Sequence, residues 1–86
     1  MTNSPIIILV EPQLSENVGM VARAMMNCGL YNLRIINPRE NHLSDKAISS
    51  SSGAEEILEK ATIFSSTKEA IADLSQVFVE IQSLFE

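Results

Sequence analysis

The segment Ile-Ile-Ile-Leu-Val-Glu-Pro at residues 6–12 decides the fold class, because its apolar run is mostly β-branched and ends at a turn. A run that is apolar at every position is typical of a strand buried on both faces, as in the centre of a parallel sheet. A second strand is predicted over residues 33–36, Leu-Arg-Ile-Ile, which Asn37 and Pro38 close.

An amphipathic helix is predicted between these two strands. Ser15 and Glu16 offer an N-terminal cap and a first-turn acid, and Gly29 offers a C-terminal cap. The apolar residues recur at helical spacing, at Val18, Val21, Ala22 and Met25. Strand, helix and strand within about thirty residues predict a parallel βαβ unit.

The remaining sequence continues the alternation of helices and strands. Residues 44–60 are predicted to be helical with a break near Gly53, followed by a strand at 62–64, a helix at 67–74 capped by Thr67, and a strand at 76–81. We therefore predict an α/β fold, a small mostly parallel sheet flanked by helices, in one domain over residues 1–86. Ligands collect at the carboxyl ends of such strands, here residues 11–17 and 37–42.

Composition limits what this domain can bind. The chain has 86 residues, 45% of them hydrophobic, and its 6 basic and 11 acidic residues give a formal net charge of −5. This sign does not suit affinity based on broad phosphate neutralisation, so any nucleic-acid contact must be local. So small a core leaves stability marginal, and dimerisation would relieve this. The acids at positions 55, 56, 59, 69 and 73 have the helical spacing of a solvated face.

The cysteine and histidine content excludes further classes of function. Cys28 is the single cysteine, which rules out a disulfide within one chain and fits a reducing, cytoplasmic setting. We expect Cys28 to be a small buried hydrophobic residue and His42, the single histidine, to be solvent-exposed without binding a metal. The apolar run at 6–10 is much shorter than the roughly 18 residues that span a bilayer, and we expect no membrane segment or targeting signal.

Residues 16–24, Glu-Asn-Val-Gly-Met-Val-Ala-Arg-Ala, contain the strongest candidates for a site. Asn17 lies at the helix entrance, and Arg23 follows Gly19 by one turn, so a guanidinium and backbone N–H groups suit a phosphate or a ribose. A glycine within a helix indicates close approach of a ligand or another backbone. The alternative is that Asn17 only caps the helix while Arg23 extends from an exposed face.

These residues resemble the first motif of the SpoU-type RNA ribose 2'-O-methyltransferases of the SPOUT superfamily. The resemblance is specific over residues 6–39, through the strand and motif quoted above, Gly29-Leu30 and residues 33–38. It is weaker from there to about residue 79. Within the family the chain is most similar to the TrmJ-like tRNA methyltransferases.

The resemblance implies methyl transfer from S-adenosylmethionine to a ribose 2'-hydroxyl of tRNA or rRNA, in a homodimer whose active site uses both subunits. Carried over, Arg23 would contact the target phosphate and help to activate the hydroxyl, and Asn17 would bind near the reacting ribose. Glu11 would shape the RNA-binding pocket. A ribose hydroxyl is a poor nucleophile, so positioning and electrostatic assistance are sensible demands on these groups.

The resemblance also implies a trefoil knot, built from two later motifs, that binds the methyl donor. Neither motif occurs in these residues, so we expect the amino-terminal part of an α/β-knot fold lacking the knot, which binds no S-adenosylmethionine and is inactive alone. The alternative is a noncatalytic, self-associating α/β module or a gene remnant. Met20, Met25 and Met26 are expected to pack in the core, or, for Met20 or Met26, on a dimer surface.

Overall fold

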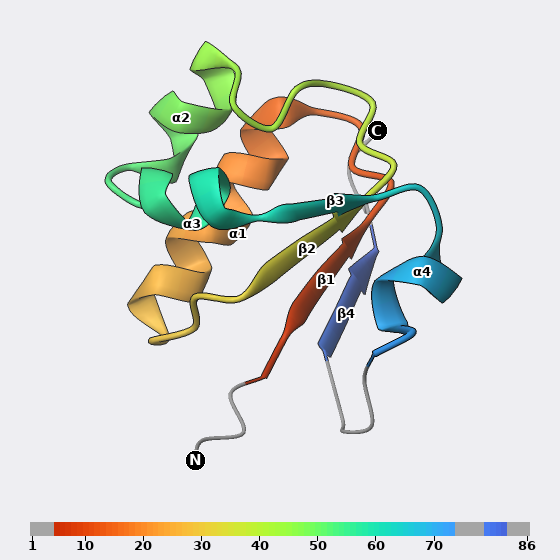
Figure 1. Cartoon of the computed structure of the whole chain (residues 1–86). Helices are drawn as coiled ribbons and strands as arrows, with labels where there is room; N and C mark the ends of the chain where they lie inside the picture. Colours follow the sequence, from red (N-terminus) through yellow and green to blue (C-terminus); the bar gives the residue numbers. More distant parts are fainter. Residues whose placement is uncertain (1–4, 74–78, 83–86) are drawn as a thin grey trace.

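The computed structural model describes residues 5–73 and 79–82. Within them, four parallel strands form one sheet in the order β3-β2-β1-β4 (Figure 1). The strands are β1 (Ile7–Val10), β2 (Leu33–Ile36), β3 (Thr62–Phe64) and β4 (Val79–Gln82). The predicted parallel sheet is confirmed. Of the strand predicted at 76–81, residues 76–78 lie outside the described residues.

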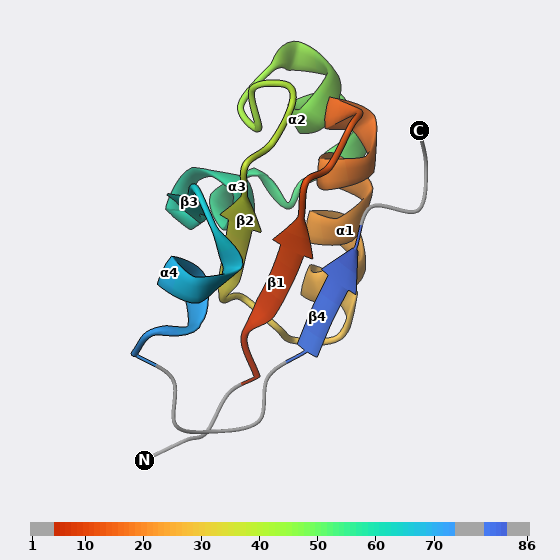
Figure 2. The ribbon, with the colours of Figure 1, turned by 90° about the vertical axis from the view of Figure 1, so that its right-hand side faces the viewer.

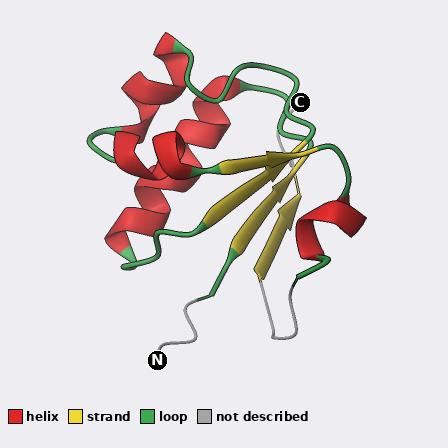
Figure 3. Ribbon diagram, viewed as in Figure 1, coloured by secondary structure: helices red, strands yellow, loops and turns green. Residues whose placement is uncertain are grey.

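The helices form a layer on each face of the sheet (Figure 3). Three helices, α1 (Ser15–Asn27), α2 (Asp45–Ser51) and α3 (Glu55–Lys60), cover one face. The short helix α4 (Thr67–Ile71) lies on the other. Figure 2 shows α4 in front of the sheet and α1 behind it. This arrangement explains why the first strand is apolar at every position.

Strand β1 is buried on both faces, as its sequence predicts. Ile7 and Leu9 join the cluster under α1, α2 and α3, whereas Ile8, with 0% of its surface exposed, joins the cluster under α4. Alternate side chains of a strand point to opposite faces, so both clusters require apolar residues here. The hydrophobic stripe of α1 packs on the first cluster through Val18, Ala22 and Met25.

Helix α1 ends at Asn27, and Gly29, which we predicted to end the helix, follows the cap position Cys28 with a left-handed φ of 74°. The N–H of Gly29 donates to the Met26 carbonyl at 3.1 Å, and the N–H of Leu30 donates to the Met25 carbonyl at 2.8 Å. These two bonds form the Schellman arrangement that satisfies carbonyls at a helix end. Cys28 precedes this turn and is exposed, so the prediction that it is buried is wrong: it lies at the end of the helix, beyond the buried stripe.

The predicted break near Gly53 is confirmed, with α2 and α3 separated by a turn in which Ser52 and Gly53 have φ of 49° and 99°. Helix α4 begins at Thr67, the residue that we predicted to be its cap, so the cap lies one residue earlier. Its cap is Ser66, whose hydroxyl accepts a hydrogen bond from the Glu69 N–H at 3.3 Å. The serine satisfies a helix N–H that would otherwise lack a partner.

Arg34 of β2 holds α4 against the sheet. Its guanidinium donates to both carboxylate oxygens of Asp73, at 2.7 and 3.1 Å, and to the carbonyl of Ala70. It also lies 5.6 Å from the ring centroid of Phe64. The hydrogen bond from Arg34 lowers the pKa of the Asp73 carboxyl, and the same bond raises the pKa of Arg34. Asp73 therefore takes part in tertiary structure rather than in a merely solvated face.

The strand order places a topological switch beside β1. The chain runs outward from β1 to β2 to β3, with its connections on one face, and then crosses to β4 on the other side of β1. In open α/β sheets, ligands bind outside the carboxyl ends of the strands, at the point where the strand order reverses. The residues that follow β1 thus lie where an open α/β sheet most often binds ligands. No helix among the described residues is long and apolar enough to cross a membrane.

Candidate functional site

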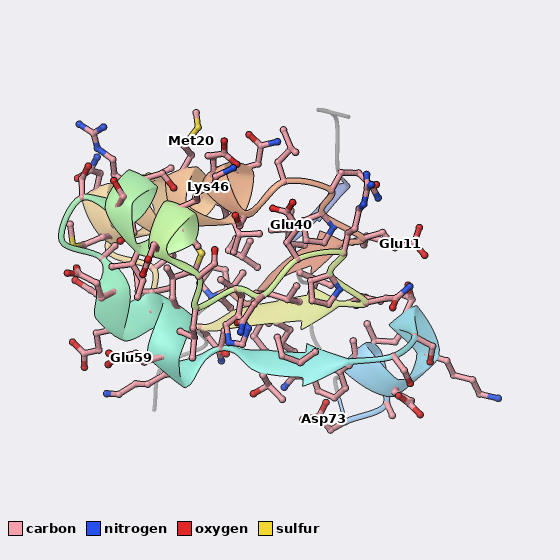
Figure 4. All side chains as sticks on the ribbon, turned by 90° about the horizontal axis from the view of Figure 1, so that it is seen from above. Glu11, Met20, Glu40, Lys46, Glu59 and Asp73 are labelled. Carbon is pink, nitrogen blue, oxygen red and sulfur yellow. The ribbon has the colours of Figure 1, made fainter. Side chains whose placement is uncertain are left out.

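The carboxyl edge of the sheet begins with two matching turns. Glu11 directly follows β1 and Asn37 directly follows β2, and both are left-handed, with φ of 48° and 47°. Their N–H groups extend the parallel ladder by one bond each, to the carbonyls of Ile36 and Phe64, both at 2.8 Å. A non-glycine residue in this conformation costs on the order of 1 kcal/mol, which the ladder bonds offset. The turns leave Glu11 exposed at the edge (Figure 4).

The loops that follow β1 and β2 are hydrogen-bonded to each other. The N–H of Arg39 donates to the Pro12 carbonyl at 3.0 Å. The N–H of Ser15, the first residue of α1, donates to the Glu40 carboxylate at 2.8 Å. Ser15 therefore does not cap α1 as predicted. The cap position is held by Leu14, which supplies no side-chain bond, and Glu40 takes over that role from the next loop.

Glu40 is an acid in a positive environment. The pKa of its carboxyl is lowered, first by the hydrogen bond from the Ser15 N–H and then by the charges of Lys46 and Arg39. The positive end of the α1 dipole acts in the same direction. One of the N–H groups that the sequence offered to a phosphate is thus already occupied by a carboxylate of the chain.

Asn17 lies inside the first turn of α1 rather than at its cap, so the interpretation of Asn17 as the capping residue is wrong. Its Nδ2 atom is buried and has no hydrogen-bond partner among the described residues. A buried amide nitrogen without a partner costs about 1 to 3 kcal/mol and calls for an explanation. A ligand oxygen at this position would supply the missing acceptor.

Arg23 is exposed on α1 and has no ion-pair partner within the described part of the chain. It is six positions beyond Asn17, which separates the two by about 9 Å along the helix axis and about 120° around it. One copy of the chain therefore does not bring the guanidinium and the amide to the same point. They can serve a single ligand only if that ligand is extended or if a second copy contributes one of them.

Gly19 is explained by packing and not by a ligand. A Cβ atom there would overlap the Ser50 hydroxyl and the Ala47 carbonyl oxygen of α2. Ser50 bridges the two helices, since its hydroxyl donates to the Glu16 carbonyl at 2.9 Å and to the Ala47 carbonyl at 3.1 Å. The space beside Gly19 is therefore filled by α2. Another backbone, one of the two explanations offered by the sequence, is the correct one.

An open groove of about 540 Å³ lies farther along the same edge, between the ends of β2 and β3 and the start of α4. Its lining includes Asn37, Ile63 and Glu69 but no cationic side chain. The Ser65 hydroxyl donates to the Glu69 carboxylate at 2.6 Å. This groove does not suit a phosphate, so an anionic ligand is expected nearer to α1.

His42 and the other potential metal ligands do not form a centre in the described residues. His42, which we expected to be solvent-exposed, is partly exposed, and burial lowers the pKa of its imidazole. No group of three His, Cys, Asp or Glu residues able to hold a metal ion occurs in residues 5–73. Serines 50 and 51 bond to carbonyls of neighbouring residues, Ser51 to Ile48 at 2.7 Å, which favours a structural role for this serine patch.

The fold defines the class of protein. It is a parallel α/β domain in which the loops after β1 and β2 form the carboxyl edge, where such sheets most often bind ligands. Comparison with known families assigns it further. The sequence model of the SpoU rRNA Methylase family matches residues 4–84. The chain therefore belongs to this family.

The relatives refine this assignment. The chain is 41% identical over 71 residues to a tRNA (cytidine-2'-O-)-methyltransferase TrmJ of Methanocaldococcus jannaschii, covering 83% of this chain and 30% of the relative. It is 44% identical over 71 residues to a tRNA (cytidine/uridine-2'-O-)-methyltransferase TrmJ of Yersinia pestis, covering 83% of this chain and 27% of the relative. The crystal structure of TrmJ from Z. mobilis superposes with a TM-score of 0.79 at 46% identity, covering 84% of this chain and 32% of that one.

The chain thus resembles the amino-terminal part of TrmJ-type tRNA methyltransferases and spans less than a third of the length of these relatives. The predicted family and fold class are confirmed. Glu11, Asn17 and Arg23 remain predicted site residues, and sequence reasoning did not indicate the contact of Glu40 with α1. No local signal marked this contact, because Ser15 is itself a preferred capping residue and only the structure places Leu14 at the cap position.

Proposed function

We propose that this chain forms the amino-terminal part of an S-adenosylmethionine-dependent tRNA ribose 2'-O-methyltransferase. The observation that carries this proposal is the likeness to TrmJ relatives, in sequence and in backbone, over more than four fifths of the chain. The names of these relatives specify tRNA, so tRNA is the favoured substrate over rRNA. Residues 1–86 would belong to one domain of the enzyme, which we place in the cytoplasm.

Three residues are proposed to act at this site. Arg23 would bind the phosphate next to the target and assist activation of the 2'-hydroxyl, and its exposed guanidinium supports this role. Asn17 would hydrogen-bond near the ribose, and its buried Nδ2, which has no hydrogen-bond partner among the described residues, supports this role. Glu11 would shape the RNA pocket from the carboxyl end of β1.

The geometry of α1 supports a homodimeric arrangement. Arg23 and Asn17 face different directions on one helix, so a composite site would take the arginine from one subunit and the asparagine from its partner. Met20 lies between them in sequence and is 55% exposed, and Leu14 at the helix start is 37% exposed. Burying such side chains in an interface would stabilise a small domain.

The methyl donor is proposed for the whole enzyme and not for these residues by themselves. When bound, S-adenosylmethionine would supply an electrophilic methyl group for the activated ribose oxygen. The described residues do not offer it a cradle: the space beside Gly19 is filled by α2, and Gly29 and Gly53 lie in turns at helix ends. The family resemblance assigns the pocket to later motifs, and we do not expect residues 1–86 alone to bind the cofactor.

A noncatalytic, self-associating module is the second candidate. The exposed Met20 and Leu14 favour it, since both lie on the helix that would form the interface. Only the methyltransferase function requires Arg23, because self-association does not require a cation at this position.

Titration of unfractionated tRNA into the purified chain distinguishes them. Arg23→Ala is expected to weaken binding about tenfold and to reduce the salt dependence of the affinity by about one ion, as expected on losing one phosphate contact. Lys68→Ala is the matched control, because Lys68 is an exposed cation on α4, on the opposite face of the sheet. Equal losses in both variants would indicate nonspecific attraction and contradict the proposed site. An Arg23→Ala variant that changes only the dimer equilibrium would favour the second candidate.

A further inference from the structure

Helix α1 depends on a distant residue for its first turn. Its cap position is Leu14, which makes no side-chain hydrogen bond to the helix. The missing acceptor comes from Glu40, 25 residues away, whose Oε1 accepts the Ser15 N–H at 2.8 Å. A carboxylate at this position satisfies an N–H group and opposes the positive end of the helix dipole.

The bond is part of a junction between the two loops of the carboxyl edge. The Arg39 N–H donates to the Pro12 carbonyl at 3.0 Å, and the Glu11 N–H donates to the Ile36 carbonyl at 2.8 Å. Pro12 and Ser15 are buried at this junction, and Ser15 is only 2% exposed. Glu40 is thus the one side chain in the set, and it is the contact that fixes the beginning of α1 to the loop after β2.

Asn17 lies two residues beyond this contact, in the same helical turn. The turn also connects α1 to Glu11 through the loop that Pro12 anchors. Any displacement of Ser15 would therefore change the position of the Asn17 amide relative to Glu11. Helix α2 also holds α1, through the packing at Gly19 and the hydrogen bond from the Ser50 hydroxyl to the Glu16 carbonyl at 2.9 Å. Loss of the Glu40 contact is therefore expected to shift the start of the first turn without detaching the helix.

We propose that Glu40 is a positioning residue for the RNA site, holding the first turn of α1 so that the Asn17 amide keeps its position at the carboxyl edge of the sheet. This inference rests on the proposed function, because it assigns Glu40 to the same RNA-binding site. Removal of the Glu40 side chain is therefore expected to weaken RNA binding, which is the opposite of what loss of its charge alone would do. An acid beside an RNA site repels phosphate, so its removal would strengthen binding if Glu40 acted only through its charge.

Two substitutions separate the effect of the length of the Glu40 side chain from the effect of its charge. Glu40→Gln keeps an oxygen acceptor at the same reach but loses the charge, whereas Glu40→Asp keeps the charge but is one methylene shorter. We expect Glu40→Gln to bind tRNA within about twofold of the unaltered chain, and Glu40→Asp and Glu40→Ala to bind about fivefold more weakly, the size of a typical coupling between neighbouring groups. Glu59→Ala is the matched control, because Glu59 is an exposed acid on α3, well away from Glu40 in Figure 4.

A double-mutant cycle with Asn17→Ala tests whether Glu40 acts on tRNA binding through Asn17 or only stabilises the fold. If Glu40 acts by positioning Asn17, Glu40→Ala will weaken tRNA binding in the unaltered chain but not in the Asn17→Ala background. Far-ultraviolet circular dichroism and the unfolding midpoint verify that each variant folds. If Glu40→Ala does not fold, the comparison of Glu40→Gln with Glu40→Asp still decides the question.

Tighter tRNA binding by Glu40→Ala, or an equal loss in both backgrounds, would overturn the inference. If Arg23→Ala and Asn17→Ala weaken binding while Glu40→Asp and Glu40→Ala do not, the inference fails and the proposed function stands. If Arg23→Ala and Asn17→Ala leave binding unchanged, the proposed function fails, and the role of Glu40 fails with it.

Discussion

Replacing Gly19 with alanine is expected to lower the free energy of unfolding by about 1 to 3 kcal/mol, the range typical of overpacking in a well-packed interior. The added Cβ would overlap the Ser50 hydroxyl, which can rotate away only by giving up its bonds to the Glu16 and Ala47 carbonyls, at 2.9 and 3.1 Å. It would also overlap the Ala47 carbonyl oxygen, which belongs to the backbone of α2 and cannot rotate away. Helix propensity acts in the opposite direction, favouring alanine by at most about 1 kcal/mol.

Urea denaturation followed by circular dichroism measures the balance of these effects. A second variant with Gly19→Ala and Ser50→Gly removes the hydroxyl but leaves the Ala47 carbonyl in place, so we expect only partial recovery of stability. Ala24→Gly is the control for helix propensity, because Ala24 is exposed on the same helix and should lose about 1 kcal/mol without any clash. A Gly19→Ala chain that is more stable than the unaltered one would refute the close approach of α1 and α2.

Two other predictions concern the second face of the sheet and the end of α1. The pKa of Asp73 is lowered in the folded state by its bond from Arg34, so its contribution to stability is present above the unfolded pKa of roughly 3.9 and is lost as the pH falls through the folded value. Asp73→Asn should therefore flatten the dependence of the unfolding midpoint on pH below about 4, and an unchanged slope would contradict the role of this ion pair. Gly29→Ala should lower the free energy of unfolding by about 1 kcal/mol. Gly29 has a φ of 74° with open space around it, so backbone strain is the only penalty. An unchanged midpoint in thermal unfolding would show that the turn tolerates a side chain.

Much of the fold could be predicted because its signals are local. The apolar run of β1, the helical spacing in α1, and the glycines at 29 and 53 each act within a few residues of chain. The cap residues were less reliable. Ser66 and Thr67 are neighbours with the same chemistry, and which of them caps α4 depends on where the backbone first turns helical. Cys28 was misplaced for a similar reason, since it lies one residue past the last turn of α1.

The candidate site was only partly predictable from its motif. Helical spacing correctly made Arg23 an exposed residue, and the glycine at position 19 correctly indicated a close approach. The spacing did not say what approaches, and the contact is Ala47 of α2 rather than a ligand. Nor did the motif indicate that Asn17 lies inside the helix with a buried Nδ2 that has no partner in the described residues.

By itself the sequence determined the class of fold, the succession of helices and strands, and the family, because periodicity, turn residues and motif spacing are properties of neighbouring residues. Only the tertiary structure decided that β4 lies beside β1, that Arg34 reaches Asp73 across 39 positions, and that Glu40 reaches Ser15 across 25. These contacts join residues distant in the chain, and no periodic pattern records them. Their energies depend on a geometry that exists only after the sheet has assembled.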